Sequence, residues 1–358
     1  MVIILSLEEN RKKINKIDEG LVKLLDERVA VCKEIGKIKA ADNIEVMDMN
    51  REREILEKAA YASEKAPADG IRLVFREVIS MCRNAQKPTS VAYLGPAGSF
   101  SHEVALTCFG NSSKYFPCRR IKKIFIEVDN GRSDVGVVPL ENSIEGGVNE
   151  TLDCFIDYPL SITGEYQFRI SQNLLVDPQV KSLSEIERVY SHPQALGQCD
   201  GYITKYLSDK DIVVTESTAR AAEHVLRDIK GAAIASKTAA DLNGLKIYEA
   251  GIEDSPNNYT RFVIVRKGES LKGGEKTSLI FALEHKPGSF SAVLDEFAKQ
   301  GINITMVISR PMPMRNWEYF FYIDFDGSIN DVNVASALKE IRGKTRFLRI
   351  LGSYSKLQ

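Results

Sequence analysis

Residues 91–106 read VAYLGPAGSFSHEVAL: an apolar strand, a turn and the start of a helix. Gly95, Pro96, Gly98 and Ser99 build the turn and favour a tight reversal of the chain. A loop of this kind at a helix N-terminus directs free backbone N–H groups toward an anion. The Gly-Lys-Ser/Thr ending of a nucleotide-triphosphate loop and the glycine spacing of a dinucleotide site are both missing. The anion therefore has to be inferred from the rest of the chain.

Short apolar runs and helical segments alternate from residue 91 to residue 266. Five of the runs are typical of buried strands: VAYL, DVGVV, RVYSH, IVVTE and AAIAS. Each precedes a stretch with helical periodicity, and the expected helices cover residues 99–108, 147–156, 193–206, 217–229 and 236–242. This alternation predicts an α/β domain with a parallel sheet.

Segments with other periods flank this α/β region. Residues 6–86 are all-α in pattern: a capping box at Ser6-Leu7-Glu8-Glu9 starts a long helix, and two shorter helices fit 49–65 and 68–85. After residue 277, the order strand–helix–strand–strand–helix–strand predicts a ferredoxin-like α+β fold. We therefore expect a multidomain chain with boundaries at residues 1–88, 90–268 and 277–358.

The bulk composition is that of an ordinary globular protein. The 358 residues are 44% hydrophobic and 27% charged, and a net charge of −1 provides no general field for nucleic acid or an anionic membrane. The N-terminal VIIL run is too short for a signal peptide or a membrane span, so we expect a cytoplasmic protein. Six cysteines without a CxxC pair indicate reduced thiols, and four scattered histidines predict no metal site.

A cation interrupts the apolar seam of the long N-terminal helix. Ile14, Leu21 and Ile35 share one heptad position, and Arg28 occupies the same position between them. A guanidinium in an apolar seam is unfavourable unless an anion pairs with it. That anion is either an internal Asp or Glu or a bound ligand.

Two further cations flank this seam and predict a homodimer. Arg11 and Lys39 are 28 positions apart, which is about 42 Å along a helix. No small ligand spans that distance, so the two side chains contact one ligand only if they come from different chains. So long a helix with two short partners also needs a second chain to cover its apolar face. We therefore expect an intertwined dimer.

Residues 6–86 resemble the helical class of chorismate mutases. The resemblance rests on the motifs LEENRKKIN, LLDERV, IGKIKA, D-x-x-REREIL and FREVISMCRNAQ. It implies a chorismate site made of Arg11, Arg28, Lys39, Asp48, Arg51, Glu52, Cys82 and Gln86. Cys82 stands where relatives often carry Ser, which predicts a weaker hydrogen bond to a substrate carboxylate.

The resemblance also implies the role of each residue. Arg28 and Arg11 of the other chain would clamp the two carboxylates, because arginine binds a carboxylate through two parallel hydrogen bonds. Lys39 and Gln86 would serve the ether oxygen as catalytic groups, and one preorganised donor there is worth about 3 kcal/mol. The ring hydroxyl would be taken by Asp48 and Glu52, with Arg51 supporting the ligand. The reaction that the resemblance implies, chorismate to prephenate, is a pericyclic rearrangement, so it needs no nucleophile or general base.

Five polar loops of the α/β region follow apolar strands, where such sheets bind ligands. They lie at 95–103, 139–147, 191–199, 216–223 and 257–265. Taken singly, each is explained as well by a turn, a strand end or a helix cap. Their joint order, with TRF at 260–262, resembles the prephenate dehydratases over residues 91–266. The loop that opens this region would then hold a carboxylate of prephenate.

Prephenate dehydration expels the ring hydroxyl as water and a carboxylate as carbon dioxide, and it leaves aromatic phenylpyruvate. It needs a donor at the hydroxyl and apolar walls around the departing carboxylate, but no cofactor. By the resemblance, Thr260 is the key donor, relayed through Glu141 or water. The implied prephenate-binding residues are Ser99, Asn142, Ser191, Gln198, Ser217, Thr218, Thr260 and Arg261. Gln172 stands where relatives often carry His, so any role of that His is absent.

The same resemblance implies that this domain has two lobes. One lobe would comprise residues 91–168 plus 258–268, and the other residues 169–257. The chain would cross twice between them, and the cleft between the lobes would hold the site. Closure about the crossings would exclude water from the reaction.

Residues 277–355 resemble the ACT domain of these dehydratases, which binds phenylalanine at a subunit interface. HKPGSFSAVL and GINIT…SRP match its two motifs, although Ile308 replaces the acid of the second and Ser289-Phe290-Ser291 alters the first. The resemblance implies feedback inhibition by L-phenylalanine and a second surface through which dimers associate further. The implied effector residues are Gly288, Ser289, Asn303 and Ser309.

The three resemblances together are those of a bifunctional chorismate mutase/prephenate dehydratase with a C-terminal ACT domain. One alternative keeps the dehydratase and makes the helical domain a dimerisation element without turnover. Arg28, Lys39 and Gln86 disfavour it, because a bare scaffold would place apolar residues at such seam positions. Another alternative is a two-lobed amino-acid-binding protein, which the TRF loop disfavours.

Overall fold

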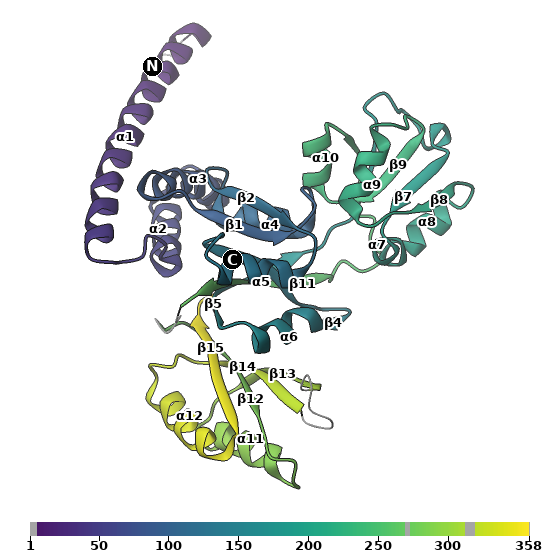
Figure 1. Ribbon diagram of the computed structural model, residues 1–358. Coiled ribbons are helices and arrows are strands. Elements are labelled where there is room, and N and C mark those ends of the chain that lie inside the picture. Colours follow the sequence, from purple (N-terminus) through teal and green to yellow (C-terminus); the bar gives the residue numbers. More distant parts are fainter. Residues whose placement is uncertain (1–5, 269–272, 312–318, 358) are drawn as a thin grey trace. The chain divides into compact units, whose positions relative to one another are not determined.

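The computed structural model describes residues 6–268, 273–311 and 319–357 (Figure 1). The chain divides into two compact units. The helical unit comprises Met1–Thr89 and Phe109–Lys114, and the α/β unit comprises Ser90–Cys108 and Tyr115–Gln358. Within the described ranges, no helix combines the length and the apolar character that crossing a membrane requires.

Three helices form the helical unit: α1 (Leu7–Ala41), α2 (Met49–Ala62) and α3 (Ala68–Gln86). The Ser6 hydroxyl accepts from the Glu9 N–H, and the Glu9 carboxylate accepts from the Ser6 N–H, which confirms the expected capping box. α1 and α3 approach closely at Gly36, where an added Cβ would lie 3.0 Å from the Cα of Gln86. Glycine therefore lets Gln86 pack directly against the α1 backbone.

The apolar face of α1 is largely uncovered. Gly36 is the one buried residue of this helix. Large apolar side chains along α1 are each more than half exposed, namely Leu7, Ile14, Ile17, Leu21, Val22, Leu24, Val31 and Ile38. Figure 1 shows α1 extending well past the ends of α2 and α3. Burying one such side chain stabilises a protein by roughly 1.5–3 kcal/mol. Covering this face of α1 would therefore add considerably to the free energy of unfolding.

The first lobe of the α/β unit is built on a mixed sheet of order β2-β1-β3-β11-β5, with β4 on β3. β1 and β3 are parallel, but β11 is antiparallel to both its neighbours because the chain adds it on returning from the second lobe. The prediction of a parallel sheet is therefore wrong for this strand. The strands are β1 (Ser90–Leu94), β2 (Lys114–Cys118), β3 (Val135–Asn142), β4 (Gly146–Gly147), β5 (Leu160–Arg169) and β11 (Tyr259–Lys267), and the helices are α4 (Phe100–Phe109), α5 (Ile121–Asp129) and α6 (Asn149–Asp157).

The second lobe has its own mixed sheet, of order β10-β6-β9-β7-β8. β7 is parallel to β8 and β9, whereas β6 and β10 are antiparallel to their neighbours. The one helix expected at 193–206 is two helices that meet at Cys199. The elements are β6 (Asn173–Val176), η1 (Leu183–Glu185), β7 (Arg188–Ser191), α7 (Pro193–Gln198), α8 (Asp200–Tyr206), β8 (Asp211–Val214), α9 (Thr218–Val225), β9 (Gly231–Ala235), α10 (Lys237–Asn243) and β10 (Lys246–Ala250).

The C-terminal module is a four-stranded antiparallel sheet of order β13-β14-β12-β15, which confirms the expected ferredoxin-like fold. It shares a core with the first lobe, since Tyr322 and Tyr354 belong to one apolar cluster with Phe155. Beyond β15, the Leu357 N–H donates to the Glu165 carbonyl of β5 at 2.7 Å. The elements are β12 (Lys276–Ala282), α11 (Ser289–Lys299), β13 (Ile304–Pro311), β14 (Tyr319–Asp326), α12 (Val332–Lys344) and β15 (Phe347–Tyr354).

Candidate active sites

Arg28 of α1 has a buried Nη1 with no hydrogen-bond partner. No Asp or Glu of the described ranges pairs with it, so the alternative of an internal ion pair is not supported. The Cys32 thiol interacts electrostatically with Arg28 and Lys39 and forms a hydrogen bond with Cys82, so these side chains lie close together. Burial first, and the Cys82 contact second, raise the pKa of Cys32 while the two cations oppose the rise. A half-buried guanidinium whose Nη1 is buried without a partner suits a bound anion.

Lys39 and Gln86, the two groups expected at the ether oxygen, keep hydrogen-bonding capacity for a ligand. Lys39 Nζ donates to the Val46 carbonyl at 3.0 Å, which uses one of its three protons. Gln86 Nε2 donates to the Cys82 carbonyl at 3.4 Å, and Gln86 Oε1 is buried without a partner. The Gln86 amide is therefore held weakly at the point where α3 meets α1.

The residues at the start of α2 are more strongly engaged. Asp48 caps the helix by accepting from the Arg51 N–H at 3.1 Å, and Arg51 pairs with Glu54 at 2.6 Å. Both oxygens of Glu52 accept from Nη1 of Arg83, a buried arginine for which the sequence predicted no role. Glu52 is thus already held by a neighbouring cation, and the structure does not leave its carboxylate free for the ring hydroxyl.

Arg11 lies on the exposed N-terminal part of α1. Since α1 is one continuous helix, Arg11 and Lys39 of one chain stay far apart and cannot contact the same ligand. The geometry of a single chain therefore brings together Arg28, Lys39, Cys82 and Gln86, but not Arg11.

A cavity of about 590 Å³ is lined by loops of both lobes of the α/β unit. Six of the residues predicted to bind prephenate line it: Ser99, Asn142, Gln198, Ser217, Thr218 and Thr260. Leu94, Phe100, Ile170 and Phe262 add apolar wall. The volume suits a small molecule, and the apolar wall suits a carboxylate that departs as a neutral product. Within the described ranges no three His, Cys, Asp or Glu side chains are grouped so that they could hold a metal ion.

Asn142 orients the hydroxyl of Thr260. The two residues face each other across β3 and β11, and Asn142 Nδ2 donates to Thr260 Oγ1 at 2.9 Å. Asn142 Oδ1 accepts from the N–H groups of Ile144 and Glu145, at 3.0 and 3.1 Å, which fixes the direction of the amide. Because Thr260 Oγ1 accepts from Asn142, its own proton is available to be donated into the cavity.

Arg261 and Glu141 do not line the cavity. Side chains alternate along a strand, so Arg261 lies on the face opposite Thr260, in register with Glu141. Its Nη2 is 2.5 Å from Asp324, and its Nη1 is 3.4 Å from Glu165. Burial lowers the pKa of Arg261, but Asp324 and other neighbours raise it overall. The roles expected for the two residues, substrate binding and proton relay, are therefore not supported.

Two further expectations fail for local reasons. Ser191 is fully buried inside its sheet, where its Oγ donates to the Ile234 carbonyl at 2.7 Å. In the opening loop, the Gly98 N–H donates to His102 Nδ1 and the Ser99 N–H to the Pro96 carbonyl, both at 3.2 Å. These two N–H groups are satisfied within the loop and are not directed at an anion.

Several residues of the cavity were not identified from the sequence. Gln172, noted only as a replacement for His, donates from Nε2 to Gln198 Oε1 at 3.2 Å, and its Oε1 is buried without a partner. Arg119, Glu145, His192, Gln194 and Glu216 also line the cavity. Glu145, His192, Gln194 and Glu216 lie in the polar loops that were expected to bind a ligand, but no role was predicted for them, and Arg119 lies outside all five loops.

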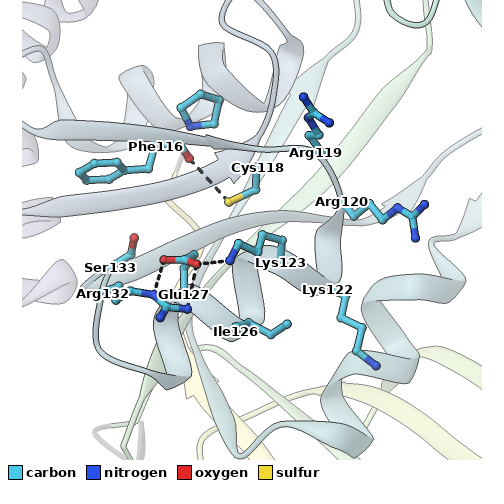
Figure 2. Close-up of a pocket in the computed structure, with 11 residues that line it drawn as sticks. Phe116, Cys118, Arg119, Arg120, Lys122, Lys123, Ile126, Glu127, Arg132 and Ser133 are labelled. Carbon is cyan, nitrogen blue, oxygen red and sulfur yellow. Dashed lines mark hydrogen bonds and ion pairs between the residues drawn. The ribbon is translucent and has the colours of Figure 1, made fainter.

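A second cavity, of about 750 Å³, is lined by eleven residues of the segment 116–133, and five of them, including Arg119, are basic (Figure 2). Glu127 neutralises two of these cations, pairing with Lys123 at 2.7 Å and with Arg132 at 2.8 Å. Arg119 and Arg120 extend away from this cluster (Figure 2).

The C-terminal module has a small cavity of about 150 Å³ next to the turn before α11. Ser289 lines it, and Gly288 adopts the left-handed conformation at the start of the helix, with φ of +79°. Asn303 Nδ2 donates to Asp326 at 2.8 Å, and Ser309 is exposed on β13, an edge strand. Only Ser289 of the four predicted effector residues lines this cavity within one chain.

One place that suits a small anion and one cavity that suits a small molecule, on two different folds of one chain, fit a multifunctional enzyme. Family models match in the order chorismate mutase type II (residues 10–87), prephenate dehydratase (91–270) and ACT domain (277–343). The bifunctional chorismate mutase/prephenate dehydratase of Aquifex aeolicus (strain VF5) is 42% identical over 357 residues, 98% of each chain. The chain belongs to the bifunctional chorismate mutase/prephenate dehydratases, with the two activities in that name and an ACT regulatory domain.

Solved structures resemble the dehydratase and ACT portion. A prephenate dehydratase from Arthrobacter aurescens, in complex with L-Phe, is 35% identical with a TM-score of 0.68, covering 75% of this chain and 90% of that chain. A structure described as GqqA, a novel type of quorum quenching acylase, is 30% identical with the same TM-score of 0.68, covering 74% and 97%.

Proposed function

We propose that chorismate binds between Arg28, Lys39 and Gln86 of one chain and Arg11 of a second copy. The unpaired Nη1 of Arg28 supports this assignment, because a carboxylate would satisfy it. Lys39 retains protons for charge that grows on the breaking ether oxygen, and a rotation of the weakly held Gln86 amide would direct Nε2 to the same atom. Asp48 remains the candidate for the ring hydroxyl, while Glu52 positions Arg83.

The cavity that contains Thr260 is the proposed prephenate site. The hydrogen bond from Asn142 to Thr260 is the observation that carries this assignment, since it leaves the Thr260 proton to stabilise the departing hydroxide. The hydroxide takes up a proton to become water, the ring carboxylate leaves as carbon dioxide, and the ring becomes aromatic. Ser99, Gln198, Ser217 and Thr218 are the polar groups proposed to orient the substrate. The product is phenylpyruvate, which places the enzyme in phenylalanine biosynthesis.

One assay tests both assignments. Purified protein is given chorismate, and prephenate and phenylpyruvate are measured for the wild type, Arg28→Ala and Thr260→Val. Arg28→Ala should lose the mutase step yet still convert added prephenate. Thr260→Val removes the hydroxyl at nearly constant shape, should lower dehydratase kcat by about 10²–10³, and should accumulate prephenate. Wild-type formation of phenylpyruvate by Thr260→Val would refute the assignment of that cavity.

The quaternary structure and location are part of the same proposal. The uncovered apolar face of α1 supports a homodimer in which a second α1 covers it. Edge strand β13 of the ACT domain offers a second surface for association into a higher oligomer. The proposed location is the cytoplasm, where reduced cysteines are the rule.

Phenylalanine is the proposed feedback inhibitor. The ACT domain and the L-Phe complex of the Arthrobacter aurescens dehydratase support this proposal. Gly288, Ser289, Asn303 and Ser309 are proposed to form the effector site together with a neighbouring copy, since Ser309 lies on the edge strand. Titration calorimetry with millimolar phenylalanine tests the proposal, and the absence of binding heat would refute it.

A further inference from the structure

The cavity that contains Thr260, called the dehydratase cavity below, has little positive charge to bind a doubly negative substrate. Of the described residues that line it, Arg119 is the one lysine or arginine, whereas Glu145 and Glu216 add negative charge. Arg261 lies on the other face of the sheet, and the Gly98 and Ser99 N–H groups are used within their own loop. The binding of two carboxylates therefore depends strongly on Arg119.

The backbone just before Arg119 is held next to the loop that opens the cavity. The Gly95 N–H donates to the Cys118 carbonyl at 2.9 Å, directly before Arg119. A Cβ on Gly95 would lie 2.7 Å from the Cβ of Pro117, so the two loops are in close contact. The end of β2 is thus fixed to the loop that opens the cavity, and the Arg119 backbone is fixed with it.

The Arg119 guanidinium is also free to bind a ligand. Its neighbours Lys122, Lys123 and Arg132 are paired with acids, at 3.3, 2.7 and 2.8 Å. Arg119 forms no ion pair within the described ranges, and Figure 2 shows it extending away from Glu127. Arg119 lines both cavities, whereas Arg120 lines the second alone, so the two adjacent arginines differ in access to the dehydratase cavity.

We propose that Arg119 binds the carboxylate of the pyruvyl side chain of prephenate, the carboxylate that the product retains. This proposal rests on the assignment of dehydration to this cavity. A cation on the ring carboxylate would stabilise the negative charge that has to be lost, so it would oppose decarboxylation. A cation on the retained carboxylate binds substrate, transition state and product alike.

The test compares Arg119→Ala and Arg119→Lys with the matched control Arg120→Ala. Dehydratase kcat and KM are measured with added prephenate, together with the inhibition constant of phenylpyruvate, and the thermal midpoint of dehydratase activity on the same samples reports on folding. Arg119→Ala should raise both KM and the inhibition constant about 10- to 100-fold, the loss of one charge-assisted hydrogen-bonded pair, with kcat within about threefold. Arg119→Lys should lie between wild type and Arg119→Ala, and Arg120→Ala should stay within about twofold of wild type.

Three outcomes would overturn the proposal. They are an unchanged KM in Arg119→Ala, a fall in kcat alone, and an equal effect in Arg120→Ala, which would indicate a general field and not a specific contact. These outcomes differ from a failure of the cavity assignment itself. In that case Thr260→Val would dehydrate prephenate like wild type, whatever Arg119 does.

Discussion

Thr260 and Arg261 are consecutive residues of β11 whose side chains lie on opposite faces of one sheet. Thr260 lines the dehydratase cavity, and Arg261 forms an ion pair with Asp324 of β14 at 2.5 Å. The strand that carries the proposed catalytic hydroxyl is therefore held from behind by the ACT domain. A change in the ACT sheet has a short physical route to the reaction.

Asp324→Asn should weaken this link. It removes the nearest of the carboxylates that face the buried Arg261. Because Glu165 still lies 3.4 Å from the guanidinium, the cost should be below the roughly 3 kcal/mol of leaving a buried charge without any partner. We expect a lower thermal midpoint for dehydratase activity and a lower dehydratase kcat, with mutase activity unchanged. The control is Asp326→Asn, an exposed acid two residues along the same strand, assayed without phenylalanine. Equal kcat values for Asp324→Asn and wild type would mean that Arg261 does not position Thr260.

Ile308→Ala should uncouple phenylalanine binding from inhibition. Ile308 of β13 packs against Gly147, where an added Cβ would collide with its Cδ1, and Gly147 lines the dehydratase cavity. The truncated side chain should loosen this contact, so several-fold more phenylalanine is needed for half-inhibition. Calorimetry should report nearly unchanged phenylalanine binding, and Val307→Ala, an exposed neighbour, should behave like wild type. Parallel losses of binding and inhibition in Ile308→Ala would contradict this route.

Dehydratase stability should fall in mild acid because of His102. Burial lowers the pKa of His102 below the ordinary 6.5, and its neutral Nδ1 accepts from the Gly98 N–H. As pH falls, the unfolded chain therefore takes up the proton first. The stabilisation is complete above about 6.5 and is lost as pH falls from there toward the lower folded value.

Urea midpoints of dehydratase activity, measured from pH 8 to pH 5, check this expectation. His102→Phe should have a lower midpoint at pH 8 and a flatter pH dependence below pH 6.5. His285→Gln, which changes an exposed histidine of the ACT domain, should keep the wild-type slope. A wild-type slope in His102→Phe would assign the acid sensitivity to other groups.

Two inactive variants should restore mutase activity when mixed. Arg11→Ala and Arg28→Ala each damage every site of their own dimer if the site uses Arg11 of one chain and Arg28 of the other. After unfolding and refolding together, half of the dimers are mixed, and each has one intact site, so roughly a quarter of wild-type activity should return. Mixing Arg28→Ala with Lys39→Ala is the control and should restore nothing, because both residues belong to the same chain's half. No recovery in the first mixture would argue against a shared site.

The fold was largely predictable because each segment has its own hydrophobic period. The capping box at Ser6, the helices of the first segment and the strand order of the last were all expected from local pattern. The direction of β11 was not: the resemblance to the prephenate dehydratases implied that the chain leaves the first lobe and returns, but the alternation of strands and helices predicted only parallel strands. Antiparallel addition of β11 follows from that excursion, and no residue in the strand signals it.

The lining of the candidate dehydratase cavity was predictable for some motif residues and not for others. Thr260 and Asn142 line the cavity as expected, but the same TRF motif includes Arg261, which alternation along the strand turns away. Arg119 was missed because it is one of several cations in a basic segment. The pairing of Lys123 and Arg132 with Glu127, and the position of Arg120 outside the dehydratase cavity, distinguish Arg119 from its neighbours only in the folded structure.

The hydrogen bond between Leu357 and Glu165 means that the effector module is tethered to the catalytic body at both of its ends. One tether is the connection after β11, and the other is the terminal tail on the outer edge of β5. A domain attached at one point can rotate without moving the strands beside it. With two attachments, a rotation of the ACT domain instead shifts β5 relative to β11. Exchanging regulatory modules between relatives would therefore have to include the tail and the edge that receives it.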